Sequence, residues 1–280
     1  MRSYNRPKDV ALVPPDPAPD LGGGRLCVVT PIYQPTLTRE EVISLQLLRR
    51  FCPQHEKVIL KPTGLVLPFD AADFRVVELD PANFAGISAY NKLMLSAWFY
   101  RLFAGYEAIL IYQTDCLILG DGLEAWLDRP WSYVGAPFLR RDGQLKAVGN
   151  GGFSLRRPGD FLKVLTSERL SMANLSRPLV NQYAKGTYLK ILMQALKAGN
   201  AADFVEVYPR AEDEFWSFYA PLFHPDYRLA PAAEAAHFAA ETRPRRIAEL
   251  AGAPPLGGHA WTVHDRPYWE ARLKAIGVEP

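Results

Sequence analysis

The chain has 280 residues, of which 49% are hydrophobic and 22% charged, and its net charge at pH 7 is +2. This length and apolar content are enough to bury a large core in one large domain or two small ones. The near balance of charge argues against a protein that binds nucleic acid through bulk positive charge, although it leaves room for a local basic groove. No run approaches about 18 consecutive apolar residues, so no transmembrane helix is expected.

The first 24 residues differ in composition from the rest of the chain. Residues 1–20 contain five prolines and no apolar run of the signal-peptide type. We expect a disordered or loosely draped arm that ends at the glycines of positions 22–24. The three cysteines match no zinc-binding spacing, and their odd number gives no disulfide framework. These features favour a cytoplasmic enzyme, or at least a protein that faces the cytoplasm.

Strand-like and helix-like segments alternate in the first half of the chain. A capping box formed by Thr38 and Glu41 predicts a helix to about Phe51. A second, longer helix is expected after Ser88, and short apolar runs predict four strands; the ranges are 89–103 for the helix and 25–30, 57–60, 74–79 and 107–112 for the strands. This alternation indicates βαβ units around a mostly parallel sheet, and therefore an α/β protein.

The second half is less regular. Short strands are predicted at 131–134 and 152–155, and helices at 159–166, 185–197, 213–219, 232–240 and 267–275. No internal repeat is present, and no sharp domain boundary is indicated. We expect a single domain over 25–280, with a nucleotide-binding half at about 25–120 and an acceptor-binding half at about 121–280.

Aromatic and polar residues follow the first strand. Ligands of open α/β sheets bind beyond the carboxyl ends of the strands. Thr30 and Pro31 end the strand and Tyr33 follows, so an aromatic ring is available there to stack on a nucleotide base. A simple strand-to-loop transition is the alternative.

A carboxylate follows the fourth strand. The run at 107–112 delivers Gln113, Thr114 and Asp115 to the same edge of the sheet. Hard divalent cations prefer oxygen ligands and often join one or two carboxylates to substrate phosphates. Asp115 is therefore a candidate metal ligand, although an Asp that starts a turn is also common.

A lysine and a glycine-rich segment are further candidates. Lys92 lies in the first turn of the helix expected at 89–103, where the helix dipole disfavours a cation, so a phosphate or sugar partner is favoured over a purely structural role. The segment around Asn150, Gly151 and Gly152 follows an aromatic run that begins at Trp131. It matches neither a Walker loop nor a dinucleotide fingerprint. We favour a loop that contacts substrate over a plain hairpin turn, because glycines allow close approach or positive φ.

Acidic residues and a histidine complete the set of candidates. Glu212 and Asp213 open a predicted helix, where acidic residues suit the dipole, and either could act as a general base. His259 follows two glycines and comes shortly before Trp261, a setting that packing explains poorly. A metal ligand or a phosphate donor is indicated there. The other four histidines are expected to be structural or on the surface.

In chain order, the segments YQTD, WSYVGAPF, GNGGFSLR, ED and GGHAW resemble those of GT-A glycosyltransferases. A helix lysine before a strand that ends in DxD is similar to the glycogenin type. The resemblance is closer to a bacterial family of proposed glycosyltransferases that was long described as a domain of unknown function. It spans about residues 25–261, and its most specific block is GNGGFSLR.

The resemblance implies a GT-A-like, Rossmann-like fold with a mixed, mostly parallel central sheet flanked by helices. It implies transfer of a sugar from a nucleotide-sugar donor, taken as UDP-linked, to a glycan or glycoconjugate acceptor. Asp115 and His259 would bind Mn or Mg. The remaining implied roles are donor binding by Thr30, Pro31, Tyr33, Lys92, Gln113, Thr114 and Asp115, sugar or acceptor contact by Trp131, Asn150, Gly151 and Gly152, and catalysis by Asp213 or Glu212.

One departure from the family pattern leaves alternatives open. Gln113 replaces the first Asp of DxD and attracts a cation less strongly, so Lys92 or Arg156 could carry part of the phosphate charge instead of a metal. A degenerate domain that binds nucleotide or glycan without turnover is one alternative. A nucleotidyltransferase is disfavoured, because no glycine-rich loop follows the first strand. Arginine clusters at 140–141 and 243–246 leave open an acceptor in modified nucleic acid, or peripheral contact with a membrane for a lipid-linked acceptor.

Overall fold

The computed structural model describes residues 11–170 and 185–280, so the first ten residues of the expected arm lie outside the described residues. The rest of the arm, residues 11–23, is draped over the domain. The backbone N–H of Val13 donates to Asn83 Oδ1 (3.0 Å), and Asn83 Nδ2 donates to the Val13 carbonyl (2.8 Å). The Leu21 side chain is buried in the core. The arm therefore belongs to the packed domain from at least Val13 onward.

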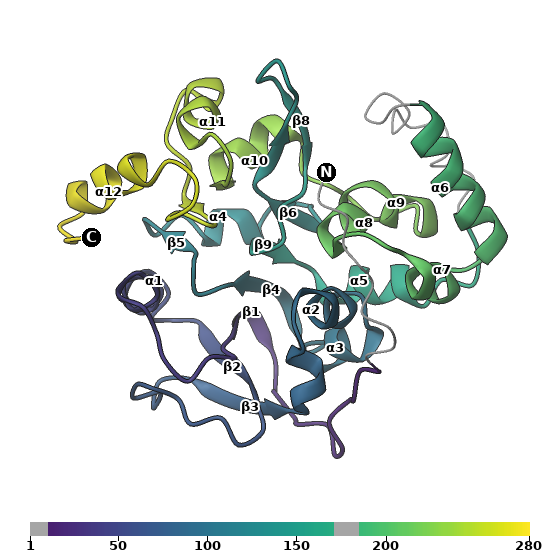
Figure 1. Ribbon diagram of the computed structural model, residues 1–280, viewed down its shortest axis with the longest axis horizontal. Coiled ribbons are helices and arrows are strands. Elements are labelled where there is room, and N and C mark those ends of the chain that lie inside the picture. The colour runs from purple at the N-terminus through teal and green to yellow at the C-terminus, as the bar shows by residue number, and fades with distance from the viewer. Residues whose placement is uncertain (1–10, 171–184) are drawn as a thin grey trace.

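A six-stranded sheet forms the centre of the molecule, in the order β3-β2-β1-β4-β9-β6 (Figure 1). The strands are β1 (Gly24–Pro31), β2 (Glu56–Pro62), β3 (Arg75–Leu79), β4 (Tyr106–Tyr112), β6 (Tyr133–Gly135) and β9 (Phe153–Arg156). The first four strands pair in parallel, and β9 is antiparallel to both β4 and β6. The carboxyl ends of β1 and β4 consequently lie side by side at one edge of the sheet.

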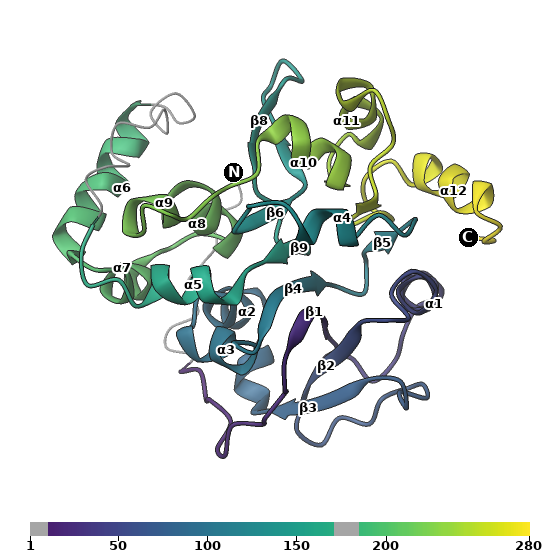
Figure 2. The same ribbon diagram turned by 180° about the vertical axis from the view of Figure 1, so that it is seen from behind.

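Helices cover both faces of this sheet. Helix α1 (Arg39–Phe51) lies on one side, and α2 (Ile87–Met94), α3 (Ala97–Leu102) and α5 (Pro158–Leu165) lie on the other (Figures 1 and 2). Most side chains of β1 and β4 are fully buried, as strands covered on both faces require. The α/β class, with a mixed and mostly parallel sheet flanked by helices, is confirmed.

Among the described residues, the remaining elements are a 3-10 helix, eight further helices and the strands of two smaller sheets. The helices are the 3-10 helix (Pro81–Phe84), α4 (Glu124–Leu127), α6 (Lys185–Ala198), α7 (Ala201–Val207), α8 (Glu212–Phe218), α9 (Ala220–Phe223), α10 (Ala232–Phe238), α11 (Pro244–Ala251) and α12 (Arg266–Ala275). Strands β7 (Pro137–Leu139) and β8 (Leu145–Val148) form a hairpin. A small third sheet joins β10 (Ala239–Ala240), β11 (Gly257–Gly258) and β5 (Leu117–Ile118). Within the described ranges, no helix is both long and apolar enough to cross a bilayer.

The helix predicted at 89–103 is wrong in one respect, because two helices occupy this range. Helix α2 begins after Gly86, whose φ of 86° suits a glycine, and it ends at Leu95; Ser88 lies inside the helix instead of capping it. Helix α3 then begins after Ser96. Lys92 therefore lies in the last turn of α2, where the dipole favours a cation. The argument that its position in a first turn calls for an anionic partner is corrected.

Candidate metal centre at the carboxyl edge of the sheet

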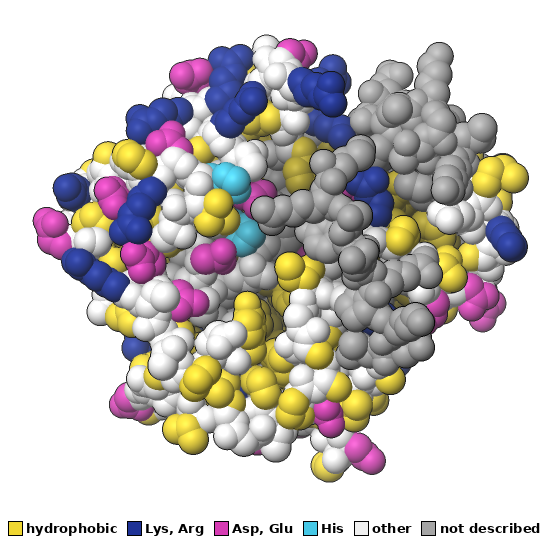
Figure 3. All heavy atoms as spheres, viewed as in Figure 1, with side chains coloured by type: hydrophobic (Ala, Val, Ile, Leu, Met, Phe, Trp, Pro, Cys, Tyr) yellow, Lys and Arg dark blue, Asp and Glu magenta, His cyan; other side chains and the backbone are white. Residues whose placement is uncertain are grey.

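Three short strands bring distant residues to one place. Strand β11 pairs with the start of β5 and runs parallel to β10, so the ends of β10 and β11 meet the beginning of β5. Asp115 precedes β5, Glu241 follows β10, and His259 follows β11. The backbone N–H of His259 donates to the Ala240 carbonyl (3.1 Å). In Figure 3, histidine side chains lie beside acidic ones in the middle of the visible face.

The imidazole of His259 contacts three other side chains, those of Gln113, Asp115 and Glu241. We call these four residues the histidine centre. The Nε2 atom lies 2.9 Å from Gln113 Oε1 and 3.4 Å from Asp115 Oδ1. The other ring nitrogen, Nδ1, lies 3.3 Å from Glu241 Oε1. Asp115 is the most open member, with 44% of its side chain exposed, whereas His259 is 14% exposed. The centre therefore faces solvent through Asp115.

Charge balance at this centre is set by two carboxylates around one imidazole. Burial alone would lower the pKa of His259, but Asp115 and Glu241 outweigh it and raise that pKa to about 10. Burial alone would raise the pKa of Asp115, but its contact with His259 lowers it. The raised pKa of His259 reflects the negative charge of the two carboxylates, which a bound cation would also neutralise.

The side chains present fit a divalent cation. An imidazole nitrogen, a carboxylate oxygen and an amide oxygen converge, which is a donor set compatible with Mn²⁺ or Mg²⁺. Histidines that bind metals commonly donate their second N–H to a carboxylate, and Glu241 is placed for that role. Among the residues that the structure describes, no group of three or more His, Cys, Asp or Glu side chains is arranged to hold a metal. The cation would therefore rely on Gln113, water and substrate oxygens for the rest of its ligands.

Two glycines form one wall of the centre. A Cβ at Gly152 would overlap the His259 imidazole and lie 2.8 Å from Gln113 Oε1. A Cβ at Gly151 would overlap the Glu212 carboxylate and lie 3.1 Å from Arg156 Nη2. Neither glycine has a positive φ. Of the two reasons offered for glycine in this segment, close approach is the one that the structure supports at these positions.

Behind this wall lies a buried ion pair between strand β9 and helix α8. Arg156 Nη2 lies 2.9 Å from Glu212 Oε1, and Arg156 Nη1 lies 3.1 Å from Glu212 Oε2. The two side chains are 0% and 3% exposed. Arg156 also donates to Ser154, Tyr100 and the Gly151 carbonyl. Because its donors are occupied inside the protein, Arg156 does not supply charge to a substrate phosphate, and the expectation that it could is corrected.

Asp213 lies next to this ion pair but outside it. Its Oδ1 accepts a hydrogen bond from the backbone N–H of Glu214 (2.8 Å). Burial, followed by the neighbouring charges of Glu212, Glu214 and Glu241, raises the pKa of Asp213 well above its usual range.

The candidate residues at the end of strand β1 differ in exposure. Thr30, inside the strand, is fully buried, and its Oγ1 has no hydrogen-bond partner among the described residues. Tyr33, in the loop that follows, is 56% exposed; the partial burial of its ring, with the charges of Asp115 and Glu41, raises its pKa. Thr114 Oγ1 donates to Glu41 Oε1 (2.7 Å), which ties the loop after β4 to the start of α1. Thr114 therefore has a supporting contact within the protein.

The structure does not bring all predicted site residues together. Trp131 precedes β6, whose Tyr133 aligns through Arg156 with Ile109 in the middle of β4. This register places Trp131 toward the amino end of β4, at the edge opposite Asp115, where its Nε1 donates to Glu234 (3.2 Å). Its expected contact with sugar is corrected on this ground.

Asn150 has a local structural role, and Lys92 lies on a helix that contacts α8. Asn150 is buried, and its Oδ1 accepts a hydrogen bond from the Gly152 N–H (3.1 Å), so it shapes the glycine turn. Lys92 lies on α2, whose Asn91 Oδ1 accepts a hydrogen bond from the Glu212 N–H (3.2 Å). Helix α2 is thereby linked to the start of α8, close to Asp213.

Glu241 is the residue of the centre that sequence reasoning missed. It lies directly after the predicted helix at 232–240 and belongs to no recognisable motif. Only the short strand β10, which replaces the last turn of that helix, places Glu241 behind His259. A histidine that binds a metal often has a carboxylate partner, which was a reason to search for one. The distance between Glu241 and His259 in the sequence, however, gave no sign of their contact.

Comparison with known proteins gives a family and two similar solved structures. None of the curated proteins matches the chain. A galactosyltransferase, LgtC, solved with donor and acceptor sugar analogues, is 14% identical with a TM-score of 0.44, over 91% of this chain and 97% of that one. The apo structure of WbbM, a bifunctional glycosyltransferase, is 13% identical with a TM-score of 0.43, over 93% of this chain but only 51% of that one. A family model matches residues 73–259. Since that match spans more than half of the sequence, the chain belongs to the family described as "Protein of unknown function (DUF5672)".

Proposed function

We propose that this protein transfers a sugar from a nucleotide-sugar donor, probed first as UDP-linked, to a hydroxyl of a glycan or glycoconjugate acceptor. The observation that carries the proposal is the convergence of Gln113 Oε1 and Asp115 Oδ1 on His259 Nε2, at the carboxyl edge of a mostly parallel sheet. Ligands of such sheets bind at this edge. A cation held between a carboxylate and an imidazole suits the diphosphate of the donor.

Residues of both halves would hold the donor. When bound, a divalent cation neutralises the negative charge that develops on the leaving diphosphate. Asp115 and His259 would hold that cation, and Glu241 would orient the imidazole. Tyr33 offers an exposed ring for the base. The half at about 25–120, together with His259 and Glu241, would thus serve the donor, and the rest of the half at about 121–280 would serve the acceptor.

Asp213 is the residue that we assign as general base toward the acceptor hydroxyl. Glu212, the other candidate, is bound on both oxygens by Arg156 and is buried behind Gly151. Asp213 has no such ion pair, and its raised pKa makes its ionised form a stronger base. A base in this position suits a reaction that inverts the sugar configuration.

A thermal-shift panel tests the donor site first. UDP, GDP, CDP and dTDP are each added with and without Mn²⁺ to the wild-type protein and to Asp115→Ala. A ligand at 100 times its Kd stabilises the native state by about 2.7 kcal/mol, which corresponds to roughly 5 °C for a chain of this size. We expect such a shift with one diphosphate, dependent on Mn²⁺ and lost in the variant. No shift with any of the four would overturn the donor site.

A turnover assay distinguishes this proposal from a degenerate domain that binds its ligand without reacting. That alternative stays open because Gln113 stands in place of an Asp. The matching nucleotide sugar is incubated with the protein, and release of the nucleoside diphosphate is followed. We expect release in the wild type and a loss of at least about 100-fold in Asp115→Asn, since the charge that stabilises the leaving group is removed. Binding without any release would assign the chain to the degenerate class.

A further inference from the structure

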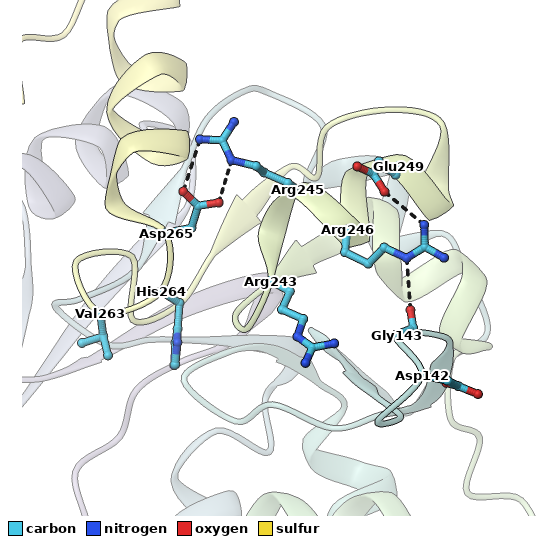
Figure 4. A pocket seen from close by; sticks show the side chains of 9 residues that line it. All are labelled: Asp142, Gly143, Arg243, Arg245, Arg246, Glu249, Val263, His264 and Asp265. Atoms are coloured by element: carbon cyan, nitrogen blue, oxygen red, sulfur yellow. Dashed lines mark hydrogen bonds and ion pairs between the residues drawn. The ribbon is translucent and has the colours of Figure 1, made fainter.

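A polar pocket lies outside the histidine centre. It has a volume of about 640 Å³ and lies between the amino ends of α11 and α12 and the β7–β8 turn (Figure 4). Its lining residues are Asp142, Gly143, Arg243, Arg245, Arg246, Glu249, Val263, His264 and Asp265. A bare ion would occupy only a small part of this volume, whereas pockets for small organic ligands commonly measure about 300–1,000 Å³. The pocket is thus large enough for a sugar that carries a charged group.

One cation of this pocket is left for a ligand. Arg245 is paired with Asp265 (2.7 Å) and Arg246 with Glu249 (3.0 Å). Arg243 is exposed and, among residues 11–170 and 185–280, its guanidinium has neither a hydrogen bond nor an ion pair. Figure 4 shows its side chain extending into the pocket without a dashed line. The three carboxylates offset the three arginines in number, but two of them are taken by Arg245 and Arg246.

The backbone around this pocket is strained at two side-chain-bearing residues. Arg243 and Asp265 precede α11 and α12, and both have left-handed conformations, with φ of 51° and 53°. A residue other than glycine in this region costs about 1–3 kcal/mol, and such residues concentrate at ligand-binding sites. Neither residue caps its helix through its side chain. The amino ends of two helices therefore face a pocket whose arginine is uncommitted, a setting that favours an anion.

Residues that line the pocket are close in sequence to residues of the histidine centre. Arg243 is two residues after Glu241, and His264 is five residues after His259. Two consecutive peptide units span at most about 7–8 Å between Cα atoms. The backbone at Arg243 therefore lies within this distance of the backbone at Glu241, the residue that contacts His259.

From these observations we infer that the pocket binds a phosphate group carried by the acceptor, so that the acceptor is a phosphorylated sugar or a sugar linked through phosphate. Calling the ligand an acceptor rests on the proposed function, whereas the phosphate site itself does not. A guanidinium pairs with phosphate through two parallel hydrogen bonds, and the unused edges of Arg245 and Arg246 add positive potential. The donor diphosphate has its own site at Asp115 and His259, so the second phosphate belongs to the other substrate.

Direct binding of glucose 1-phosphate tests the site, with glucose as the neutral control. Calorimetry is run on the wild-type protein, Arg243→Ala, Arg243→Lys and Arg101→Ala. Arg101 is exposed on α3, away from the pocket, and serves as the matched loss of one charge. We expect wild-type binding that weakens with salt, a loss of at least tenfold in Arg243→Ala, partial recovery in Arg243→Lys and no change in Arg101→Ala. Equal affinity in the wild type and Arg243→Ala, or equal binding of glucose, overturns the inference.

Vesicles identify the source of the phosphate. Sedimentation with phosphatidylglycerol vesicles is compared with phosphatidylcholine vesicles for the same four proteins. Binding to the anionic vesicles that is lost in Arg243→Ala, with weak binding of glucose 1-phosphate, would support the phosphate site and assign a lipid-linked source. No binding of either phosphate probe would reject the site. Because the Mn²⁺-dependent shift with nucleoside diphosphates is measured separately on the wild type, failure of the phosphate pocket and failure of the donor site give different results.

Discussion

At the scale of single residues, the absence of a side chain at Gly152 matters as much as any functional group. The His259 imidazole occupies the space that a Cβ there would need. Gly152→Ala should push His259 away from Gln113 and abolish the Mn²⁺-dependent shift with nucleoside diphosphate, at a cost of about 1–3 kcal/mol from overpacking. Thermal melts with and without ligand measure both effects.

The control for this variant is Gly159→Ala. A Cβ at Gly159 would meet no atom within 4 Å, and the residue lies in α5. Alanine is also the better helix former, so this variant should keep ligand binding and be at least as stable as the wild type. Retained ligand binding in Gly152→Ala would contradict the geometry described for the centre.

Asp213 should show a conflict between stability and catalysis. Its folded-state pKa is raised, so its contribution to stability is fully present below the unfolded value near 3.8 and is lost as the pH rises through the folded pKa. Asp213→Asn should therefore be more stable than the wild type at pH 7.5, with the difference shrinking toward pH 4. Urea unfolding at several pH values measures this.

The same Asp213→Asn variant should lose about 100-fold or more in sugar transfer, since the general base is gone, while binding of the donor diphosphate is kept. A variant that is more stable but equally active would remove Asp213 from the reaction and leave its raised pKa as a property of packing alone.

At the scale of elements, the parts that the sequence predicts are those with local signals. The Thr38–Glu41 capping box forms as predicted and starts α1. The apolar runs of β1, β2 and β4 are strands, because continuous hydrophobic runs suit strands buried on both faces. By contrast, the helical spacing of apolar residues continues past Leu95 and Ser96, which separate α2 from α3. Periodicity alone therefore could not reveal this break.

The elements that build the centre had no local signal. Strands β10 and β11 have the sequences Ala-Ala and Gly-Gly, which carry no strand preference. They are strands because close packing selects them: a Cβ at Gly257 would lie 2.5 Å from the Leu117 carbonyl oxygen. The sequence could therefore nominate Asp115 and His259 separately, but the contact between them, and the place of Glu241, depend on tertiary pairing. Their catalytic and metal-binding roles stay predictions.

Strand β10 gives Glu241 a testable role as the residue that orients His259. Glu241→Gln should weaken Mn²⁺ binding by about 10- to 100-fold, as loss of partners behind a ligand histidine usually does. Manganese titration in the presence of the nucleoside diphosphate measures the affinity. Glu270→Gln, which breaks a half-exposed pair with Arg266 on α12, is the control and should bind Mn²⁺ normally. Equal affinity in both variants would mean that Glu241 does not support the imidazole.

At the scale of the whole molecule, a buried ion pair ties helix α8 to the central sheet. Arg156 ends strand β9 of that sheet, and Glu212 begins α8. Both oxygens of Glu212 are bound by this arginine, which also contacts Tyr100 on α3. The turn at Gly151 and Gly152 lies between this pair and the histidine centre. The position of Asp213 relative to Asp115 thus depends on the pair.

This dependence predicts a large effect on global stability. Glu212→Gln leaves the Arg156 charge buried without a counter-charge and should lower the free energy of unfolding by about 3–5 kcal/mol, a large share of the roughly 5–15 kcal/mol typical of a domain. The double variant Arg156→Met with Glu212→Leu should recover much of that loss, because no buried charge remains. Glu270→Gln, which breaks a half-exposed pair, should cost less than about 1 kcal/mol. Urea unfolding of the three proteins measures the differences. If Glu212→Gln costs no more than the half-exposed control, the buried pair does not hold α8 against the sheet, and another contact must position Asp213.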